Sequence, residues 1–187
     1  DRPARGWGFN GQVRTSYPPA EKIPEGMDWD LWLGPCQEDV PFSRAIHPTT
    51  WRPWWSFGCG GLGDIGCHTI DTAYWALGLG APDRVEVDMT EKANPIHTPN
   101  GSIVTYKFPA RGKQPAVDVK WIEGPRLPKA PKGYDWEIKG NGGFIMVGEK
   151  GGISHDGMRP NSPRLYPKSR WESYRKNANE RVPKTLK

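Results

Sequence analysis

Three stretches from residue 84 onward alternate apolar with polar residues and are separated by turns rich in Pro, Gly and Asn. They cover residues 84–90 (RVEVDMT), 102–108 (SIVTYKF) and 116–122 (AVDVKWI). Because a period of two places every second side chain on the same face, each stretch is predicted to be a half-buried strand. A further hairpin is predicted over residues 143–154, with its turn at residues 149–151.

The clearest helix is predicted over residues 63–78, before these strands. Asp64 would lie in its first turn, where the helix dipole favours a negative charge, and Gly78 would end it. A shorter helix is predicted over residues 28–34, where Asp28 is a suitable N-cap. A leading helix followed by antiparallel strands predicts an α+β fold, with one sheet that is covered on one face.

The remaining segments have less regular patterns. Residues 11–17 form one short alternating run that is a candidate strand, while residues 35–58 alternate Pro and Trp with polar residues and are predicted to be an ordered loop. We therefore divide the chain into a Pro- and Trp-rich segment with loops and a short helix (1–58), a core of helix and antiparallel sheet (59–167) and a polar C-terminal segment (168–187).

Composition narrows the classes of protein to consider. The 187 residues are enough for one domain, and 10 Trp, 6 Tyr and 5 Phe supply large side chains for its core. The net charge of +5 comes from scattered Lys and Arg without a nucleic-acid-binding motif, so no nucleic-acid partner is expected. No run approaches the roughly 20 apolar residues that span a bilayer, so no membrane partner is expected either.

Cysteine usage and the chain start bear on the compartment. Cys36, Cys59 and Cys67 are an odd set without CxxC spacing, which argues against a disulfide framework and favours a reducing compartment such as the cytoplasm. No signal peptide opens the chain, but it starts at Asp1 without a Met. We therefore expect a piece of a longer protein, and export stays open.

The stretch GCGGLGDIGCHTID (58–71) carries the candidate chemistry. Its Gly58-x-Gly60-x-x-Gly63 spacing, before a helix and a strand that ends near Asp88, matches a dinucleotide-binding turn. Against this interpretation, the preceding TWRPWWSF is not a Val/Ile strand, and Pro53 would remove a ladder donor. The strands downstream are also separated by turns and not by helices.

A second interpretation is an acid–base site. Asp64 and His68 are four residues apart and therefore share one helix face, with Asp71 a turn further on. A carboxylate next to an imidazole raises its proton affinity and orients the ring, as a general base requires. Gly60 and Gly61, together with Gly63, would let a ligand approach. The alternative is that Asp64 is only a helix-terminal charge and His68 a satisfied core residue, and the spacing does not decide.

Two weaker possibilities complete the sequence-based candidates. A metal could be held by Asp64, His68 and Asp71 with Cys59 or Cys67, but no HExxH or paired CxxC supports it, and no metal is expected. Four residues before the helix combine aromatic faces with a guanidinium, which suits polyhydroxylated ligands: Trp51, Arg52, Trp54 and Trp55. A core formed by these tryptophans under the loop is the favoured alternative.

The block GGLGDIGCHTIDTAYWALGLGAP resembles the Gfo/Idh/MocA family, the group of glucose–fructose oxidoreductase and inositol dehydrogenase. Three other segments occur in the order seen in a bacterial subgroup of this family: MDWDLWLGP before the block, then VTYKFPARGKQPAVDVKW and GFIMVGEKGGI after it. The resemblance therefore covers nearly the whole chain. It implies the substrate-binding domain, an open, mostly antiparallel sheet with helices on one face. The family's D-x-x-x-H pair falls on Asp64 and His68.

The resemblance further implies a catalytic histidine that removes the proton of a substrate hydroxyl, beside an aspartate that orients it or binds the hydroxyl. Hydride would then pass to NAD or NADP. Weaker roles are substrate binding by Arg52, Trp54, Trp55 and Asp71 and cofactor contact by Gly60 and Gly61. The implied partners are a sugar or polyol substrate and a second copy of the chain, joined through the sheet face.

The chain departs from the family in what it lacks. The family's N-terminal Rossmann domain, its Glu-Lys-Pro motif and its C-terminal helix are not recognisable here. We therefore expect a fragment that binds the cofactor mainly through a missing domain and is inactive alone. Two other functions stay open: an NAD-dependent glycosidase of the same family, and a noncatalytic carbohydrate-binding or oligomerisation module.

Overall fold

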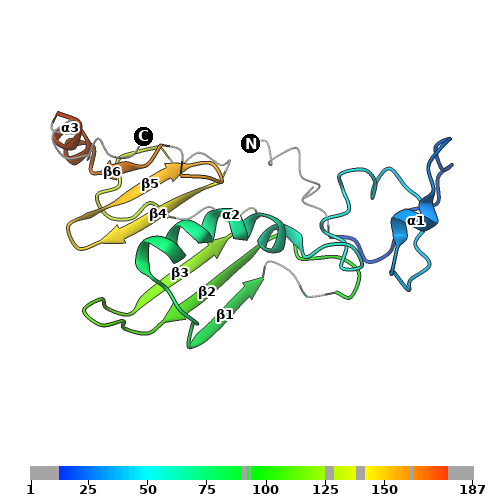
Figure 1. The fold of residues 1–187 in the computed structure, drawn as a ribbon, viewed down its shortest axis with the longest axis horizontal. Helices are drawn as coiled ribbons and strands as arrows, with labels where there is room; N and C mark the ends of the chain where they lie inside the picture. Colours follow the sequence, from blue (N-terminus) through cyan, green and yellow to red (C-terminus); the bar gives the residue numbers. More distant parts are fainter. Residues whose placement is uncertain are drawn as a thin grey trace. The chain divides into compact units, whose positions relative to one another are not determined.

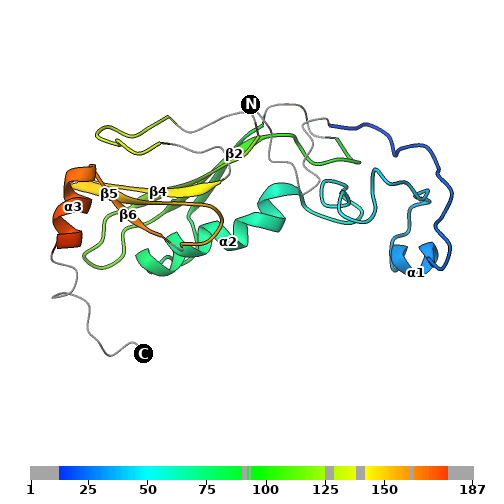
Figure 2. The same ribbon diagram turned by 90° about the horizontal axis from the view of Figure 1, so that it is seen from above.

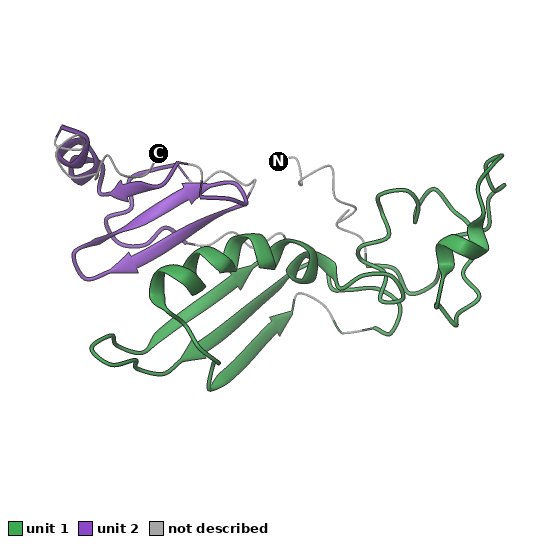
Figure 3. Cartoon of the chain, in the orientation of Figure 1, with its two compact units in different colours: residues 1–127 green, residues 128–187 purple. Residues whose placement is uncertain are grey.

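The protein is described by a computed structural model, which covers residues 13–89, 92, 94–124, 129–137, 142–160 and 162–176. It contains two compact units, residues 1–127 and 128–187 (Figure 3). Each unit has its own three-stranded antiparallel sheet. The predicted α+β class is confirmed. The expectation of one sheet is wrong, because the described strands of the second unit pair only with one another.

The sheet of the first unit has the order β1-β2-β3, with β1 at Arg84–Met89, β2 at Ser102–Phe108 and β3 at Val117–Ile122. These bounds lie within one residue of the predicted strands. In the antiparallel register, Val87 is opposite Val104, which is opposite Trp121. One face of the sheet is therefore lined by apolar side chains, as the alternation predicts.

Helix α2 (Gly60–Leu77) lies along this apolar face (Figures 1 and 2). Its buried residues include Gly66, Thr69 and Ala73. The helix ends as predicted, since Gly78 adopts a left-handed conformation with φ of 56°. It starts three residues earlier than predicted, so Asp64 lies one turn inside the helix and not in its first turn.

The opposite face of the sheet is charged. Lys107 Nζ lies 3.6 Å from Glu86 Oε2 and 3.8 Å from Asp118 Oδ2, in a row that crosses all three strands. All three side chains are 40–50% exposed, so these ion pairs contribute little stability. Helix α2 lies on the apolar face but leaves its β1 edge open. Val85 and Val87 are 49% and 59% exposed, so the prediction that β1 is half-buried is wrong.

The Pro- and Trp-rich segment forms a separate aromatic core. Helix α1 (Trp29–Leu33) begins at Asp28, whose Oδ1 accepts a hydrogen bond of 2.9 Å from the Leu31 N–H, so the predicted N-cap is confirmed. The core consists of Trp29, Val40, Phe42, Ile46 and Trp54. The candidate strand over residues 11–17 is wrong for residues 13–17, which form no strand, while residues 11–12 lie outside the described part.

Three backbone hydrogen bonds fasten this segment to the start of α2 and to the chain that leads into β2. Trp55 N donates to Ile96 O (3.0 Å), Thr98 N to Pro53 O (2.8 Å) and Gly60 N to Arg52 O (3.0 Å). The loop that carries Arg52 is therefore held directly against the first turn of α2.

The second unit contains β4 (Gly143–Gly148), β5 (Gly151–Asp156), β6 (Arg164–Tyr166) and α3 (Lys168–Lys176). The predicted hairpin is confirmed, with β4 and β5 joined at residues 149–150. Strand β6 and helix α3 were not predicted. The strand has only three residues, and the sequence of the helix, KSRWESYRK, is almost entirely polar.

Candidate functional site

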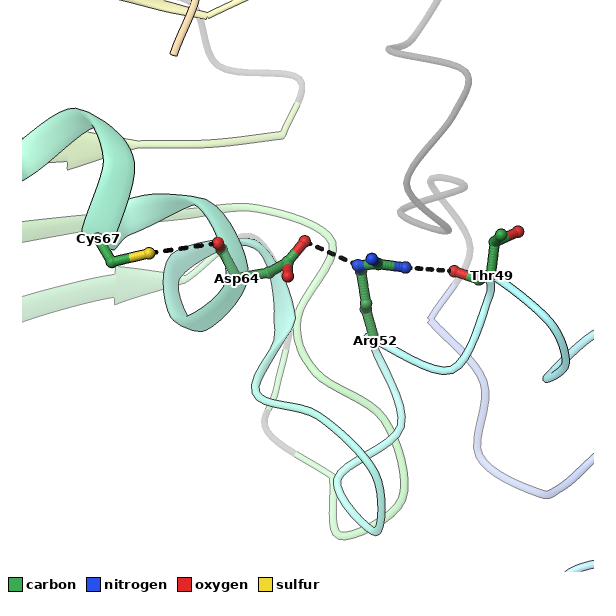
Figure 4. Close-up of polar contacts among 4 residues, drawn as sticks. All are labelled: Thr49, Arg52, Asp64 and Cys67. Carbon is green, nitrogen blue, oxygen red and sulfur yellow. Dashed lines mark hydrogen bonds and ion pairs between the residues drawn. The ribbon is translucent and has the colours of Figure 1, made fainter. Parts of the chain in front are cut away.

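The most definite polar contact near the glycine-rich segment joins Arg52 to Asp64 (Figure 4). Arg52 Nε donates to Asp64 Oδ2 at 2.8 Å, and the two side chains are 17% and 27% exposed. Arg52 also donates from its NH1 group to Thr49 O at 2.9 Å and lies 4.7 Å from the centre of the Trp51 ring. The Asp64 carboxylate is therefore anchored to the loop that precedes α2.

His68 lies one turn further along α2 and is exposed. At about 100° per residue, Asp64, His68, Asp71 and Trp75 fall within roughly 60° of one another around the helix axis. This outward stripe is opposite the residues that α2 buries against the sheet, and Trp75 is 83% exposed. Within the described part of the chain, the side chains of His68 and Asp71 have no hydrogen-bond partner.

The structure thus changes part of the expectation for the acid–base pair. Asp64 and His68 share one face, but the carboxylate binds Arg52 and makes no described contact with the imidazole. The alternative for His68, a satisfied core residue, is wrong because its side chain is exposed. The alternative for Asp64, a charge in the first turn of the helix, is also wrong. Their joint role in catalysis stays a prediction.

The space beside the glycines is filled by the chain's own side chains. Gly60 has φ of +68°, and a Cβ at this position would lie 2.9 Å from Thr98 Oγ1. A Cβ on Gly61 would lie 2.2 Å from Glu123 Oε2. Packing within the protein is thus sufficient to explain both glycines, and the suggested cofactor contact of Gly60 and Gly61 stays a prediction. No strand leads into α2, so the dinucleotide interpretation fails.

The tryptophans before α2 divide between two environments. Trp54 is only 1% exposed and packs against Tyr17 and His97, with ring centres 5.3 and 5.2 Å apart. It belongs to the core and is closed to a ligand, which corrects its suggested role in substrate binding. Trp55 is 47% exposed and its indole N–H donates to Asn94 O at 3.0 Å, so part of this side chain is accessible to solvent.

Metal binding has no support in the described residues, where no three His, Cys, Asp or Glu side chains come together. Cys59 and Cys67 are exposed free thiols. Cys67 Sγ lies 3.6 Å from the backbone oxygen of Asp64, to which it donates along the helix (Figure 4).

Sequence reasoning missed one acidic residue near this site, Glu123. Its Oε1 accepts a hydrogen bond of 2.7 Å from Ser102 Oγ, and its Oε2 lies against Gly61. Burial raises the pKa of Glu123 above its ordinary value, while Ser102 and the nearby indole N–H of Trp121 act in the opposite direction. The Trp121 N–H is buried and does not reach hydrogen-bond geometry with the carboxylate. A signal was present, because Glu123 continues the apolar alternation of β3.

Residues 4–138 match the oxidoreductase family's C-terminal alpha/beta domain in the Gfo/Idh/MocA group, and this match spans well over half of the chain. The chain belongs to the Gfo/Idh/MocA oxidoreductase family. The resemblance noted from the sequence is thereby confirmed. The matched part of this Gfo/Idh/MocA domain includes Arg52, Asp64, His68 and Glu123, whereas β4–β6 and α3 lie beyond it.

Two further findings accompany this assignment. No curated protein matches the chain. Among the residues that the structure describes, no helix has both the length and the apolar character that a membrane span needs.

Proposed function

We propose that this chain is the substrate-binding part of an NAD(P)-dependent oxidoreductase that acts on a hydroxyl group of a sugar, a sugar acid or a cyclitol. The proposal rests on the family and on one feature of the structure. His68 is exposed on the outward face of α2, one turn from a carboxylate that Arg52 holds in place. An open imidazole beside a fixed charge is the arrangement that a general base needs.

In this proposal, the neutral imidazole of His68 accepts the proton of the substrate hydroxyl. Removing that proton gives the oxygen alkoxide character, which favours loss of hydride from the carbon that bears it. Asp64, held by Arg52, presents a negative charge near the imidazolium that forms and accepts a hydrogen bond from a neighbouring hydroxyl. The exposed side chains of Asp71 and Trp55 are further candidates for contact with a polyol.

A nicotinamide cofactor, when bound, would accept the hydride. Thr98 and Glu123 pack beside Gly60 and Gly61 at the start of α2. We therefore propose that the cofactor is held elsewhere than at this glycine-rich turn. The chain alone is expected to be inactive.

The test is cofactor reduction by the longest natural polypeptide that contains this chain, measured with a panel of sugars, sugar acids and cyclitols. His68→Ala should lower kcat by about 10²–10⁴-fold, the usual contribution of a general base. Asp64→Asn should also lower it, whereas Asp83→Asn, an exposed aspartate between α2 and β1, should not. A fully active His68→Ala enzyme would remove the proposed role.

A noncatalytic carbohydrate-binding or oligomerisation module is the second candidate. The observation in its favour is that Asp64 pairs with Arg52 and not with His68, as a purely structural carboxylate would. Such a module would bind a sugar, or associate through the β1 edge of the sheet where Val85 and Val87 are exposed, without reducing a cofactor. Calorimetric binding that His68→Ala leaves unchanged, together with no cofactor reduction on any substrate of the panel, would favour this alternative.

A further inference from the structure

Glu123 stands just beyond the end of β3, below the first turn of α2. It follows Val117, Val119 and Trp121 in the period-two order, so it is an acidic residue on the face that the helix covers. Its backbone N–H donates to Ser102 O at 3.0 Å, and its side chain accepts from Ser102 Oγ at 2.7 Å. The backbone and the side chain of Glu123 are therefore both hydrogen-bonded to Ser102.

The second carboxylate oxygen lies against α2. A Cβ on Gly61 would approach Glu123 Oε2 to 2.2 Å and the Trp121 ring to 4.0 Å, so the carboxyl occupies the place of a side chain at position 61. Cys59, the N-cap residue of α2, makes no side-chain capping bond, and the first turn of the helix holds no acidic residue. The carboxyl of Glu123 therefore packs against a helix start that has no acidic side chain of its own.

The position of Gly61 on the helix connects this contact to the candidate site. Gly61 lies in the turn of α2 that precedes Asp64, and His68 follows Asp64 by one further turn. Asp64 is held from the loop side by Arg52, and Gly61 is held from the sheet side by Glu123. The two contacts together fix the direction of the first two turns of α2.

We infer that Glu123 is a positioning residue, whose carboxyl, fixed by Ser102, holds the glycine-rich start of α2 and thereby sets where Asp64 and His68 lie. This inference rests on the proposed function of those two residues. The residues that contact the carboxyl are Gly61 from α2, Ser102 from β2 and Trp121 from β3, and none of them titrates at ordinary pH. Asp64, neutralised by Arg52, and the Cys59 thiol are the titratable groups on the adjoining helix start.

If Glu123 positions α2, ionisation of its carboxyl should change the NMR signals of His68. Burial raises the pKa of this carboxyl, so it gains its charge above the pH range of an exposed glutamate. When the carboxyl ionises, the first turn of α2 shifts slightly, and the NMR signals of residues further along α2 change as well. A side chain that merely fills space would have no such effect.

The first experiment is a substitution cycle, read as the midpoint of urea unfolding. Gly61→Ala should lower the midpoint in the natural background, because the new methyl group must displace the carboxyl from Ser102. In a Glu123→Ala background the same substitution should raise the midpoint, since alanine favours a helix. Glu123→Asp gives a second background with a shorter acid, should Glu123→Ala not fold. An equal effect of Gly61→Ala in the natural and the altered background would overturn the contact.

The second experiment follows the His68 ring and the Asp64 amide by NMR as pH is raised. The natural chain should show a step in both signals at the pH where Glu123 titrates, and Glu123→Gln should remove it. Glu137→Gln, a change at an exposed glutamate of the second unit, is the matched control and should keep the step. Identical titration curves in the natural chain and Glu123→Gln would overturn the positioning role. Neither experiment uses substrate, so either failure leaves the proposed function standing.

Discussion

The ion pair between Arg52 and Asp64 allows a quantitative test of how the candidate site is held. The perturbation is the set Arg52→Met, Asp64→Asn and the double variant. Methionine keeps most of the volume of the arginine stem and removes its donors, while asparagine removes the charge of the aspartate. The coupling energy of this double-mutant cycle isolates the interaction between the two side chains from their other contacts.

The structure sets the expected magnitude. A hydrogen bond to a charged group contributes about 1.5–3 kcal/mol when buried, whereas exposed ion pairs contribute about 0.2–1 kcal/mol. The side chains of Arg52 and Asp64 are 17% and 27% exposed, with Nε and Oδ2 separated by 2.8 Å. We therefore expect a coupling energy of about 1–2 kcal/mol. Arg52→Met alone should cost more, about 2–3 kcal/mol, because the contacts with Thr49 and Trp51 are also lost.

The assay is urea unfolding at neutral pH with each variant, repeated at high salt. A matched control cycle uses Arg84→Met and Glu86→Gln, because Arg84 Nε lies 3.0 Å from Glu86 Oε1 but the side chains are 71% and 41% exposed. The control should couple by less than about 1 kcal/mol and lose most of that in salt. An Arg52–Asp64 coupling energy no larger than that of the control cycle would contradict a stabilising, partly buried ion pair.

Three other predictions concern stability and pH. Gly60→Ala should lower the free energy of unfolding by about 2–4 kcal/mol, because φ of +68° strains the alanine and Thr98 blocks its methyl group. Gly78→Ala should lower it by only about 1 kcal/mol, because Gly78 has φ of 56° but open space around it. Equal losses of the two variants in urea unfolding would contradict this prediction. Trp54→Ala should cost about 3–5 kcal/mol, since the ring is buried in the aromatic core, and a thermal midpoint like that of the natural chain would contradict it. Because the pKa of Glu123 is raised in the folded state, the folded chain binds this proton more tightly than the unfolded chain does. Stability should therefore fall as the pH rises from the ordinary glutamate range through the raised pKa. Glu123→Gln should flatten that part of the plot of urea midpoint against pH, and an unchanged slope would contradict the prediction.

Local patterns predicted the elements of the first unit well. The three strands alternate apolar with polar residues over most of their length, and the chain has Gly78 where α2 needs a left-handed residue. Strand bounds and the end of the helix therefore follow from neighbouring residues alone. The start of α2 was misplaced by three residues. Its first turn is fixed by a hydrogen bond from Gly60 to the Arg52 carbonyl and by packing against Thr98, which are contacts between segments.

The partners of the candidate residues were harder to predict for the same reason. Helical spacing places Asp64 on the same face as His68. It does not show that Arg52, twelve residues earlier, forms an ion pair with the Asp64 carboxylate. Strand alternation also places Glu123 on the apolar face, yet its burial depends on where α2 crosses the sheet. The pairing of strands into two sheets likewise depends on contacts between distant segments, which no local period reports.

The central claim is that His68 accepts a proton from a substrate hydroxyl, and chemical rescue tests it most directly. The longest natural polypeptide that contains this chain would carry His68→Ala, and cofactor reduction would be measured with and without added imidazole. The account predicts a loss of about 10²–10⁴-fold that free imidazole partly restores, with a rate that increases with the fraction of neutral imidazole. Full activity of His68→Ala without imidazole would contradict the claim.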